Sequence, residues 1–392
     1  MKVAIDGTAL NSHTGGTETY VRNIISGLGT VDPHGDYTLL LDKPLPQNSI
    51  PSAENMRRVI VRTHYQPISI PFWRNGLTAV QWYPPTAEQA LALLRERIDV
   101  LHVTITAPLF VPARIVVTVH DIAFERYPQF YPPDFVARLR VMVPLAIRRA
   151  AIVLTLSEFS KQHIVRRYSV PSEKIVVVPC AAGSMYQPIY DEARLAAVRK
   201  RYGTSEHFIL YVGDLQPRKN LKTLVTAYTR LRQTDTIRHK LVLVGRKGWL
   251  YDELFTVMRA SGYIDDLVLT DYVPDEDLVA LYNAANLLVY PSIFEGFGIP
   301  PLEAMACGTP VVTSTTSSLP EVVGDAAITV DPLDAEAMAQ AIAQVLNNRA
   351  LRAELIARGL RRASLFSWEE TARTIQSVYQ RVARGQHRAS LP

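Results

Sequence analysis

Cysteine is scarce in this 392-residue sequence, which contains only Cys180 and Cys307. Both lie among apolar residues, and neither has a partner in a CxxC pair. This pattern argues against a disulfide scaffold and against a structural zinc site. We therefore expect two buried thiols in a reducing compartment.

Long apolar runs are also missing. The longest, from Val141 to Leu156, is interrupted by Arg148 and Arg149, so it cannot form an ordinary membrane span. The residues after Met1 lack the basic, apolar and small-residue order of a signal peptide. We expect a cytoplasmic protein whose membrane contact, if any, is peripheral and on the inner face of the plasma membrane.

Charge of one sign is only slightly in excess, with a net charge of +5. Such an excess mildly favours anionic partners such as phosphates or acidic lipids, but it does not identify one. We expect no nucleic-acid partner. Solenoid repeats and low-complexity tracts are absent from the sequence as well.

Short β-branched runs do recur, and they alternate with helical patterns. This alternation predicts an α/β protein with parallel sheets and crossover helices. The pattern restarts at Phe208, which indicates two Rossmann-like halves, 1–182 and 183–366, followed by a helix and tail, 367–392, that we expect to pack back on the first half. The expected strands are 3–5, 37–41, 100–103, 115–119, 152–156, 175–178, 208–212, 240–244, 267–269, 287–290, 310–313 and 327–330.

The most informative stretch is Pro291–Pro310, which follows an expected strand. Its glycines allow close approach of the backbone to a ligand, and its two adjacent prolines suit the first turn of a helix. A helix N-terminus at the carboxyl edge of a parallel sheet is an anion site. The flanking carboxylates, Glu295 and Glu303, would repel a bare phosphate, so we expect them to bind hydroxyls of a ribose and a sugar. The alternative is that both only cap the helix or face solvent.

The segment from Glu295 to Glu303 resembles the signature of the retaining glycosyltransferases of family 4, and the resemblance extends over nearly the whole chain. It implies the GT-B fold, in which two Rossmann-like domains face each other across a cleft. It also implies that Glu295 contacts the donor sugar and that Glu303 binds the ribose. The amides that would hold the sugar or the diphosphate belong to Gly296, Phe297, Gly298 and Ile299.

A second motif, from Tyr211 to Leu221, ends a strand at Gly213 and places Arg218 and Lys219 in a turn before a helix. Two cations there would neutralise a diphosphate, although a solvated helix start is the alternative. The resemblance implies this role for Lys219. The family usually has an arginine directly after the glycine, where this chain has Asp214, so we expect Arg218 to replace it. We also expect Lys219 and Glu295 to lie at the cleft surface, where alanine would abolish transfer and preserve the fold.

Two further loops follow strands in the second half. Arg246 and Lys247 resemble the next donor-side loop of the family, and the resemblance implies that the backbone at Val273 reads the nucleotide base. Because such recognition uses the backbone and not side chains, the sequence does not identify the base. The DxD pattern of 275–277 opens a helix, where capping explains it better than a metal. We expect neither a metal nor another cofactor.

The first half carries two weaker signals. Gly15 and Gly16 lie between the first strand and a helix, and they resemble the flexible glycine loop that approaches the donor or acceptor. His120 follows an expected strand, where relatives place a histidine near the donor sugar. A plain turn and a structural histidine are the alternatives.

The segment from Tyr131 to Arg149 combines apolar residues with several arginines. A basic amphipathic helix can lie on anionic lipid, although a solvated helix face is the commoner meaning of such a pattern. Contact with a membrane would suit a lipid-linked acceptor.

The resemblance is greatest to bacterial mannosyltransferases of polysaccharide assembly. It implies transfer of a hexose with retention of configuration to a glycan or lipid-linked saccharide, with GDP-mannose the leading donor and UDP-hexoses next. Two alternatives stay open at this point. One is an isomerase of the sugar nucleotide 2-epimerase type, which shares the fold and would interconvert donors without an acceptor. The other is a non-catalytic partner subunit, which would bind a donor without turnover.

Overall fold

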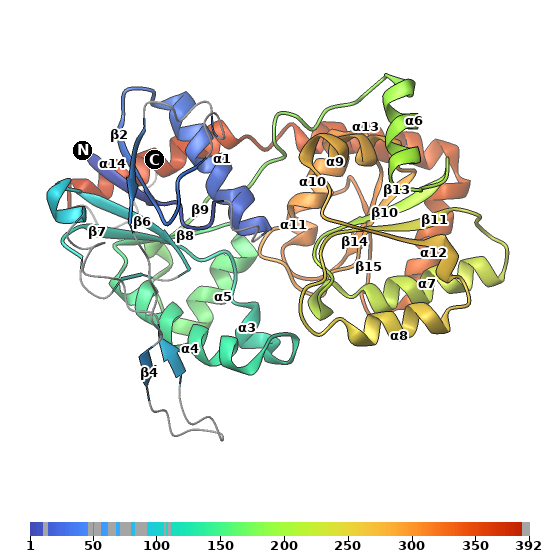
Figure 1. Cartoon of the computed structure of the whole chain (residues 1–392), viewed down its shortest axis with the longest axis horizontal. Helices are drawn as coiled ribbons and strands as arrows, with labels where there is room; N and C mark the ends of the chain where they lie inside the picture. Colours follow the sequence, from blue (N-terminus) through green and yellow to red (C-terminus); the bar gives the residue numbers. More distant parts are fainter. Residues whose placement is uncertain are drawn as a thin grey trace. The chain divides into compact units, whose positions relative to one another are not determined.

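The computed structural model describes residues 1–10, 15–45, 50, 56–61, 68–70, 80–82, 92–105, 107–108 and 111–385. The chain divides into two compact units (Figure 1). Unit 1 comprises Met1–Cys180 with Trp368–Pro392, and unit 2 comprises Ala181–Ser367. The part of the expected tail beyond residue 385 lies outside the described residues.

Unit 1 is built on a seven-stranded parallel sheet in the order β3-β2-β1-β6-β7-β8-β9. Its strands are β1 (Lys2–Asp6), β2 (Asp36–Leu41), β3 (Arg57–Ile60), β6 (Val100–Thr104), β7 (Arg114–Thr118), β8 (Ile152–Thr155) and β9 (Ile175–Val177). The central strands are apolar and buried, as expected of a parallel sheet covered on both faces. A separate antiparallel pair is formed by β4 (Ile68–Ile70) and β5 (Val80–Trp82).

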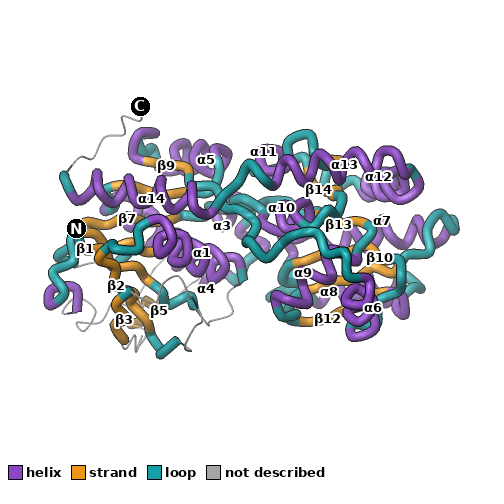
Figure 2. Tube along the Cα trace, turned by 90° about the horizontal axis from the view of Figure 1, so that it is seen from above, coloured by secondary structure: helices purple, strands orange, loops and turns teal. Residues whose placement is uncertain are grey.

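The helices of unit 1 include the end of the chain. They are α1 (Gly16–Val31), α3 (Ala123–Arg126), η2 (Pro128–Phe130), α4 (Pro133–Arg149), α5 (Glu158–Tyr168), η3 (Ser172–Lys174) and α14 (Trp368–Ala383). In Figure 2, α14 lies beside α1. Contact is close, since a Cβ on Gly27 would lie 2.9 Å from the carbonyl oxygen of Trp368. Thr371 of α14 also donates a hydrogen bond of 2.6 Å to the carbonyl of Pro179, so the terminal helix completes unit 1.

Unit 2 is built on a six-stranded parallel sheet in the order β12-β11-β10-β13-β14-β15. Its strands are β10 (Phe208–Val212), β11 (Lys240–Val244), β12 (Leu267–Asp271), β13 (Leu287–Tyr290), β14 (Val311–Ser314) and β15 (Ile328–Val330). This is the strand order of a dinucleotide-binding Rossmann sheet. From β10 the chain adds strands towards one edge of the sheet, and from β13 it adds them towards the other edge, so the order reverses between β10 and β13. Ligands bind such sheets at this switch point, beyond the carboxyl ends of the strands.

Helices cover both faces of the second sheet, with α9 and α13 on one side and α7 and α8 on the other (Figure 1). The helices of unit 2 are α6 (Glu192–Arg201), η4 (Pro217–Lys219), α7 (Leu221–Gln233), α8 (Asp252–Ala260), η5 (Ile264–Asp266), α9 (Asp275–Ala284), α10 (Ile299–Ala306), α11 (Leu319–Val323), α12 (Ala335–Asn347) and α13 (Arg349–Ala363). Two parallel sheets with crossover helices confirm the predicted fold class. No helix in the described ranges combines the length and the apolar character that crossing a bilayer requires.

Candidate functional site

The candidate site of unit 2 is built from the loops that follow its strands. The amide of Gly213, after β10, donates to the carbonyl of Val244 at the end of β11 (2.8 Å). The amide of Gly245 in turn donates to the carbonyl of Asp271 at the end of β12 (3.1 Å). These bonds join the loops after three neighbouring strands at one edge of the sheet.

Gly213 and Gly245 are required by this join. Both have a φ of 144°, a conformation that side chains disfavour. A Cβ on Gly245 would lie 2.1 Å from the carbonyl oxygen of Gly213, a distance at which two atoms overlap. Any larger residue at position 245 would push the two loops apart.

The two motifs beside the switch point contact each other directly. Arg218 and Lys219 lie in η4 after β10, whereas Glu295 lies in the loop after β13. Arg218 Nη1 lies 2.8 Å from Glu295 Oε2, and Lys219 Nζ lies 2.7 Å from Glu295 Oε1. The backbone amide of Ile293 also donates to the carbonyl of Arg218 (2.9 Å). The three charged residues that the sequence assigned to the donor thus form one cluster.

The structure corrects the predicted exposure of Lys219 and Glu295. Lys219 is only 9% exposed and Glu295 only 7% exposed, so neither lies at the surface as predicted. Each side chain reaches its ionic partner in the interior, because removal of a charge from water is costly unless the charge is paired. Alanine at Glu295 would leave Arg218 and Lys219 without their buried partner, whereas alanine at Lys219 would leave Glu295 paired with Arg218.

The two neighbouring cations keep the Glu295 carboxylate ionised. Burial alone would raise the pKa of Glu295, but Arg218 and Lys219 hold it at about 2. Burial lowers the pKa of Lys219, and Glu295 opposes that effect. With two cations and one anion, the cluster has one net positive charge to offer an anionic ligand.

Two stacked tyrosines support the cluster, and the sequence analysis missed both. The Tyr290 hydroxyl accepts a hydrogen bond from Lys219 Nζ (2.7 Å) and donates one to Glu295 Oε1 (3.0 Å). The ammonium of Lys219 also lies 5.0 Å from the centre of the Tyr290 ring. The Tyr211 ring stacks on Tyr290 at 6.1 Å, and its hydroxyl donates to the Asp214 carbonyl (3.2 Å). Tyr211 and Tyr290 lie in apolar strands, where the sequence pattern predicts only core packing. Nothing in the sequence therefore indicated that their hydroxyls form these hydrogen bonds.

The turn between Glu295 and α10 leads into the N-terminus of that helix. Gly298 precedes the helix with a φ of 97°, and a Cβ there would lie 2.7 Å from Leu319 Cδ2. The first turn of α10 contains Pro300 and Pro301, which have no N–H to leave unsatisfied. The amides predicted to hold the ligand, from Gly296 to Ile299, therefore lie at the N-terminus of an eight-residue helix.

Glu303, in the same helix, lies in a cage of tyrosines. Its Oε2 accepts a hydrogen bond of 2.7 Å from the Tyr282 hydroxyl. Burial raises the pKa of Glu303 to about 7, although hydrogen bonds from Tyr282 and Tyr186 lower it. The carboxyl therefore changes its charge near neutral pH. No sequence signal pointed to these two tyrosines.

The remaining residues predicted in unit 2 surround this edge. Arg246 lies 6.0 Å from the exposed ring of Tyr272, and Lys247 lies 5.2 Å from the ring of Phe255 in α8. Val273 is buried directly after β12. The structure thus places the Arg246 and Lys247 cations beside aromatic rings.

The acidic start of α9 binds neighbouring side chains. Asp277 accepts hydrogen bonds of 2.7 Å from both Arg201 and Tyr202. The first turn of α9 also contains Asp275 and Glu276, at the helix end where acidic residues are favourable. Among the residues that the structure describes, no group of three His, Cys, Asp or Glu could hold a metal ion.

In unit 1, His120 follows β7 and packs its ring against Tyr20 of α1, with ring centres 4.7 Å apart. Burial lowers the pKa of His120 to about 4, so the imidazole is neutral at physiological pH. Within the described part of the chain, its buried Nε2 has no hydrogen-bond partner. Gly15, with a φ of 62°, and Gly16 begin α1, and Thr14 before them lies outside the described residues.

A buried histidine that the sequence analysis missed lies beneath His120. His102 of β6 forms hydrogen bonds with the Tyr379 hydroxyl (2.6 Å) and the Thr118 hydroxyl (2.7 Å). The Thr118 hydroxyl lies 2.9 Å from that of Tyr20. Burial lowers the pKa of His102 to about 3, so it remains neutral. This chain of hydrogen bonds joins α14 to α1 through side chains of β6 and β7.

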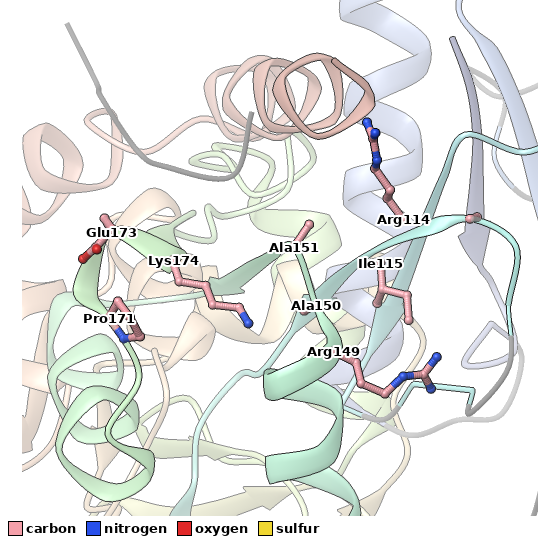
Figure 3. Close-up of a pocket in the computed structure, with 9 residues that line it drawn as sticks. Arg114, Ile115, Arg149, Ala150, Ala151, Pro171, Glu173 and Lys174 are labelled. Carbon is pink, nitrogen blue, oxygen red and sulfur yellow. The ribbon is translucent and has the colours of Figure 1, made fainter. Parts of the chain in front are cut away.

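A surface pocket in unit 1 lies at the opposite edge of the sheet, where β7 and β8 begin (Figure 3). Three cations line it, but Arg114 and Arg149 point away from each other in Figure 3. Arg114 Nη1 donates to the carbonyls of Val382 and Ala383, both at 2.6 Å, and Arg149 donates to that of Pro108. These side chains bind backbone carbonyls and do not converge on a ligand. The pocket is therefore no candidate for the site.

Comparison with known proteins identifies relatives of both units. The family model Glycosyl transferases group 1 matches residues 197–362, and Glycosyltransferase Family 4 matches residues 14–182. O-antigen chain mannosyltransferase B of Escherichia coli is 40% identical over 265 residues, which cover 67% of this chain and 70% of that protein. The serotype-specific mannosyltransferase WbdA of Escherichia coli is 32% identical over 268 residues, 67% of this chain but only 33% of that protein.

The fold itself is found in solved structures. Sucrose-phosphate synthase from Thermosynechococcus elongatus superposes with a TM-score of 0.75 over 98% of this chain and 100% of that chain, at 20% identity. Identity this low supports the fold alone. Together with the family models, it confirms the GT-B fold class.

Proposed function

The chain belongs to the glycosyl transferases group 1 and glycosyltransferase family 4, and from that premise we propose that it transfers mannose from a nucleoside diphosphate sugar to a hydroxyl of a glycan or lipid-linked saccharide. The observation that carries this proposal is the cluster of Arg218, Lys219 and Glu295 at the switch point of the second sheet. Its net positive charge lies where a diphosphate would bind in a Rossmann sheet.

Chemically, the reaction breaks the bond between the anomeric carbon and the diphosphate oxygen. Negative charge develops on the leaving diphosphate, and positive charge develops on the sugar. Arg218, Lys219 and the amides before α10 stabilise the leaving group by fixed electrostatics. Glu295 holds both cations in place and offers its carboxylate to sugar hydroxyls.

We propose that configuration is retained and that no side chain acts as a covalent nucleophile. The acceptor oxygen attacks on the face that the diphosphate leaves, and the departing phosphate oxygen takes the acceptor proton. Because the two cations supply the positive charge that a metal would otherwise provide, the reaction needs neither a metal nor another cofactor. Activity is expected to persist in EDTA.

The choice of mannose and of the donor base in this proposal is based on relatives of the chain. O-antigen chain mannosyltransferase B and WbdA both have mannosyl transfer in their names, which supports mannose over other hexoses. GDP is the expected nucleotide, with UDP next. Within unit 2, we propose that Val273 reads the base through its backbone, that Arg246 and Lys247 approach the donor, and that Glu303 binds the ribose. In unit 1, His120, Gly15 and Gly16 keep the roles that the family resemblance implies.

The test has two stages. Thermal-shift measurements with GDP, UDP, ADP and dTDP sugars identify the donor, because a ligand that binds only the native state raises its melting temperature. Transfer is then measured with Lys219→Met and Glu295→Gln, which keep the side-chain volume and remove the charge. We expect each to reduce transfer by at least about a hundredfold, the scale seen on removal of one group that stabilises a developing charge. Wild-type activity in both folded variants would contradict the proposed site.

The same assays separate the alternatives. An isomerase would interconvert sugar nucleotides without an acceptor, whereas a transferase needs an acceptor or slowly hydrolyses its donor. A non-catalytic subunit would bind the donor and never turn it over. Buried, paired charges at the switch point favour turnover, because they match the leaving diphosphate of a transfer reaction.

We also propose that unit 1 contacts the inner face of the plasma membrane through α4. Val141 and Leu145 are exposed on this helix, and Arg148 shares their face because the three residues are spaced by one turn each. Apolar residues with a cation on one face suit the surface of an anionic bilayer. Vesicles of phosphatidylglycerol should sediment the wild type but not Leu145→Asp with Arg148→Glu. Arg238→Glu, an exposed site in unit 2, should behave as wild type.

A further inference from the structure

A short hydroxyl-rich loop after β14 lies against the turn that contains Glu295. Thr316 Oγ1 donates to the carbonyl of Ile293 (2.9 Å), and Ser317 Oγ accepts from the amide of Glu295 (3.0 Å). Ser318 Oγ lies 2.9 Å from the carbonyl oxygen of Glu295 and 3.0 Å from that of Phe297. Three consecutive side chains thus hold the backbone of the turn on one side.

Ser318 is the last of these three residues, and it is fully buried. It occupies the N-cap position of α11, where a serine usually accepts a hydrogen bond from the first helical amides. Its side chain makes no such bond here. The hydroxyl donates to the Glu295 turn, so the local preference of serine for helix capping is given up for a contact with the candidate site.

The direction of these bonds decides where the next amides point. In a trans peptide, the carbonyl of one residue and the N–H of the next residue point in opposite directions. Both peptides concerned are trans. When Ser318 holds the carbonyls of Glu295 and Phe297, the N–H groups of Gly296 and Gly298 must point to the other side of the turn.

A second contact fixes the same corner. Leu319, the residue after Ser318, packs so closely on Gly298 that a Cβ there would lie 2.7 Å from Leu319 Cδ2. A side chain at position 298 is therefore excluded both by Leu319 and by the φ of 97°. Both ends of the turn are oriented by Ser318 and its neighbour.

We propose that Ser318 is a positioning residue that aims the amides of Gly296 and Gly298 at the diphosphate or the transferred sugar of the donor. This inference rests on the proposed function, because it assigns those amides to the donor. Ser318 itself does not touch the donor. It acts through two carbonyls that it holds on the opposite side of the turn.

The test is Ser318→Ala, with Ser314→Ala as the matched control. Ser314 ends β14, is equally buried, and its hydroxyl has no hydrogen-bond partner among the described residues. Calorimetry with GMP, GDP and GDP-mannose, or with the uridine series if the thermal-shift screen selects UDP, measures the affinity of each variant. The monophosphate keeps the α-phosphate but lacks the β-phosphate and the transferred sugar, the two groups that the amides would bind.

We expect Ser318→Ala to bind the monophosphate as the wild type does and to bind GDP, GDP-mannose or both about tenfold more weakly, as one lost buried hydrogen bond predicts. Ser314→Ala should match the wild type with all three ligands. If Ser318→Ala does not fold, Ser318→Cys, a weaker donor of similar size, is expected to show the same selective loss.

If Ser318→Ala binds all three ligands as tightly as the wild type does, the inference is overturned. An equal loss of affinity for all three ligands would also overturn it, because such a loss indicates general disruption. Failure of the proposed function looks different. In that case the wild type binds no sugar nucleotide, or Lys219→Met transfers sugar at the wild-type rate. A wild type that binds and transfers, beside a Ser318→Ala variant without selective loss, refutes the role of Ser318 alone.

Discussion

The hydroxyl of Tyr282 donates a hydrogen bond of 2.7 Å to the carboxyl of Glu303, a group that burial brings to a pKa of about 7. A carboxyl with this pKa exchanges a proton in the physiological range. Tyr282 favours the ionised form, because a hydrogen bond donated to a carboxylate lowers its pKa.

Donor affinity should therefore depend on pH through Glu303. If the ionised carboxylate accepts the ribose hydroxyls, affinity rises as the pH passes from 6 to 8. Tyr282→Phe removes the stabilising bond, so the midpoint should shift to higher pH. Calorimetric titration with the nucleoside diphosphate across this range measures the midpoint. Identical pH profiles for wild type and Glu303→Gln would contradict the assignment.

Folding stability should respond to the same group in the opposite direction. The pKa of Glu303 is about 7 in the folded state against an ordinary value of 4.5, so the folded state holds its proton to higher pH. The stability that the protonated group contributes is present below pH 4.5 and is lost as the pH rises through 7. Linkage predicts a loss of about 3 kcal/mol from this carboxyl. Urea unfolding of wild type and Glu303→Gln between pH 5 and 8 measures it, since the glutamine variant lacks this dependence.

Glu295 should behave in the reverse sense. Its pKa is about 2 in the folded state, below the ordinary value of 4.5, so its contribution is present above pH 4.5 and is lost as the pH falls towards 2. Glu295→Gln should be less stable than wild type at pH 7 by roughly 3 to 5 kcal/mol, because two buried cations lose their partner. The gap should narrow below pH 4.5. Glu253→Gln, which removes an exposed pair with Lys222, should differ little from wild type at any pH.

Tyr290 offers a test of how the cluster is held. Tyr290→Phe keeps the ring beside Lys219 and removes the hydroxyl between Lys219 and Glu295. We expect it to lower kcat by about tenfold, on the scale of one misdirected hydrogen bond to a charged group. Tyr211→Phe removes a hydroxyl from the neighbouring ring that contacts only a backbone carbonyl among the contacts described. A loss in Tyr211→Phe equal to that in Tyr290→Phe would indicate disturbed ring packing.

The buried chain through His102 should stabilise unit 1. Tyr379→Phe leaves a ring nitrogen of His102 without its partner in the interior, which is expected to cost about 1 to 3 kcal/mol. Tyr190→Phe, at a position 93% exposed, serves as the control. Chemical unfolding followed by circular dichroism compares the two. A Tyr379→Phe variant as stable as wild type would show that His102 finds another partner.

Strand positions were predictable because each expected strand is an apolar, β-branched run between turn residues. The starts and ends differ by a residue or two, as at Arg114–Thr118 against the expected 115–119. The edge strand β3 was not predicted, since Arg57 and Arg58 form half of its four residues. An edge strand tolerates charge, so its pattern does not stand out from a loop.

Site residues were predictable where the backbone demands them. Gly213 and Gly298 follow or precede regular elements and take conformations that glycine alone adopts readily. The tyrosines around Glu295 and Glu303 could not be found in the same way. The sequence pattern of an apolar strand or helix is the same whether or not the hydroxyl of its tyrosine forms a hydrogen bond. Ser317 and Ser318 had one available signal. They follow a parallel strand, and all such strands end at the same edge.

The return of α14 to unit 1 gives the two units different histories during synthesis. Unit 2 is one uninterrupted stretch of chain, Ala181–Ser367, so all of it is synthesised before the last helix is made. Unit 1 must wait for Trp368 and Tyr379 to cover α1 and His102. We therefore expect chains truncated after residue 367 and released from the ribosome to carry a protease-resistant second unit beside a first unit whose apolar face still requires protection by chaperones.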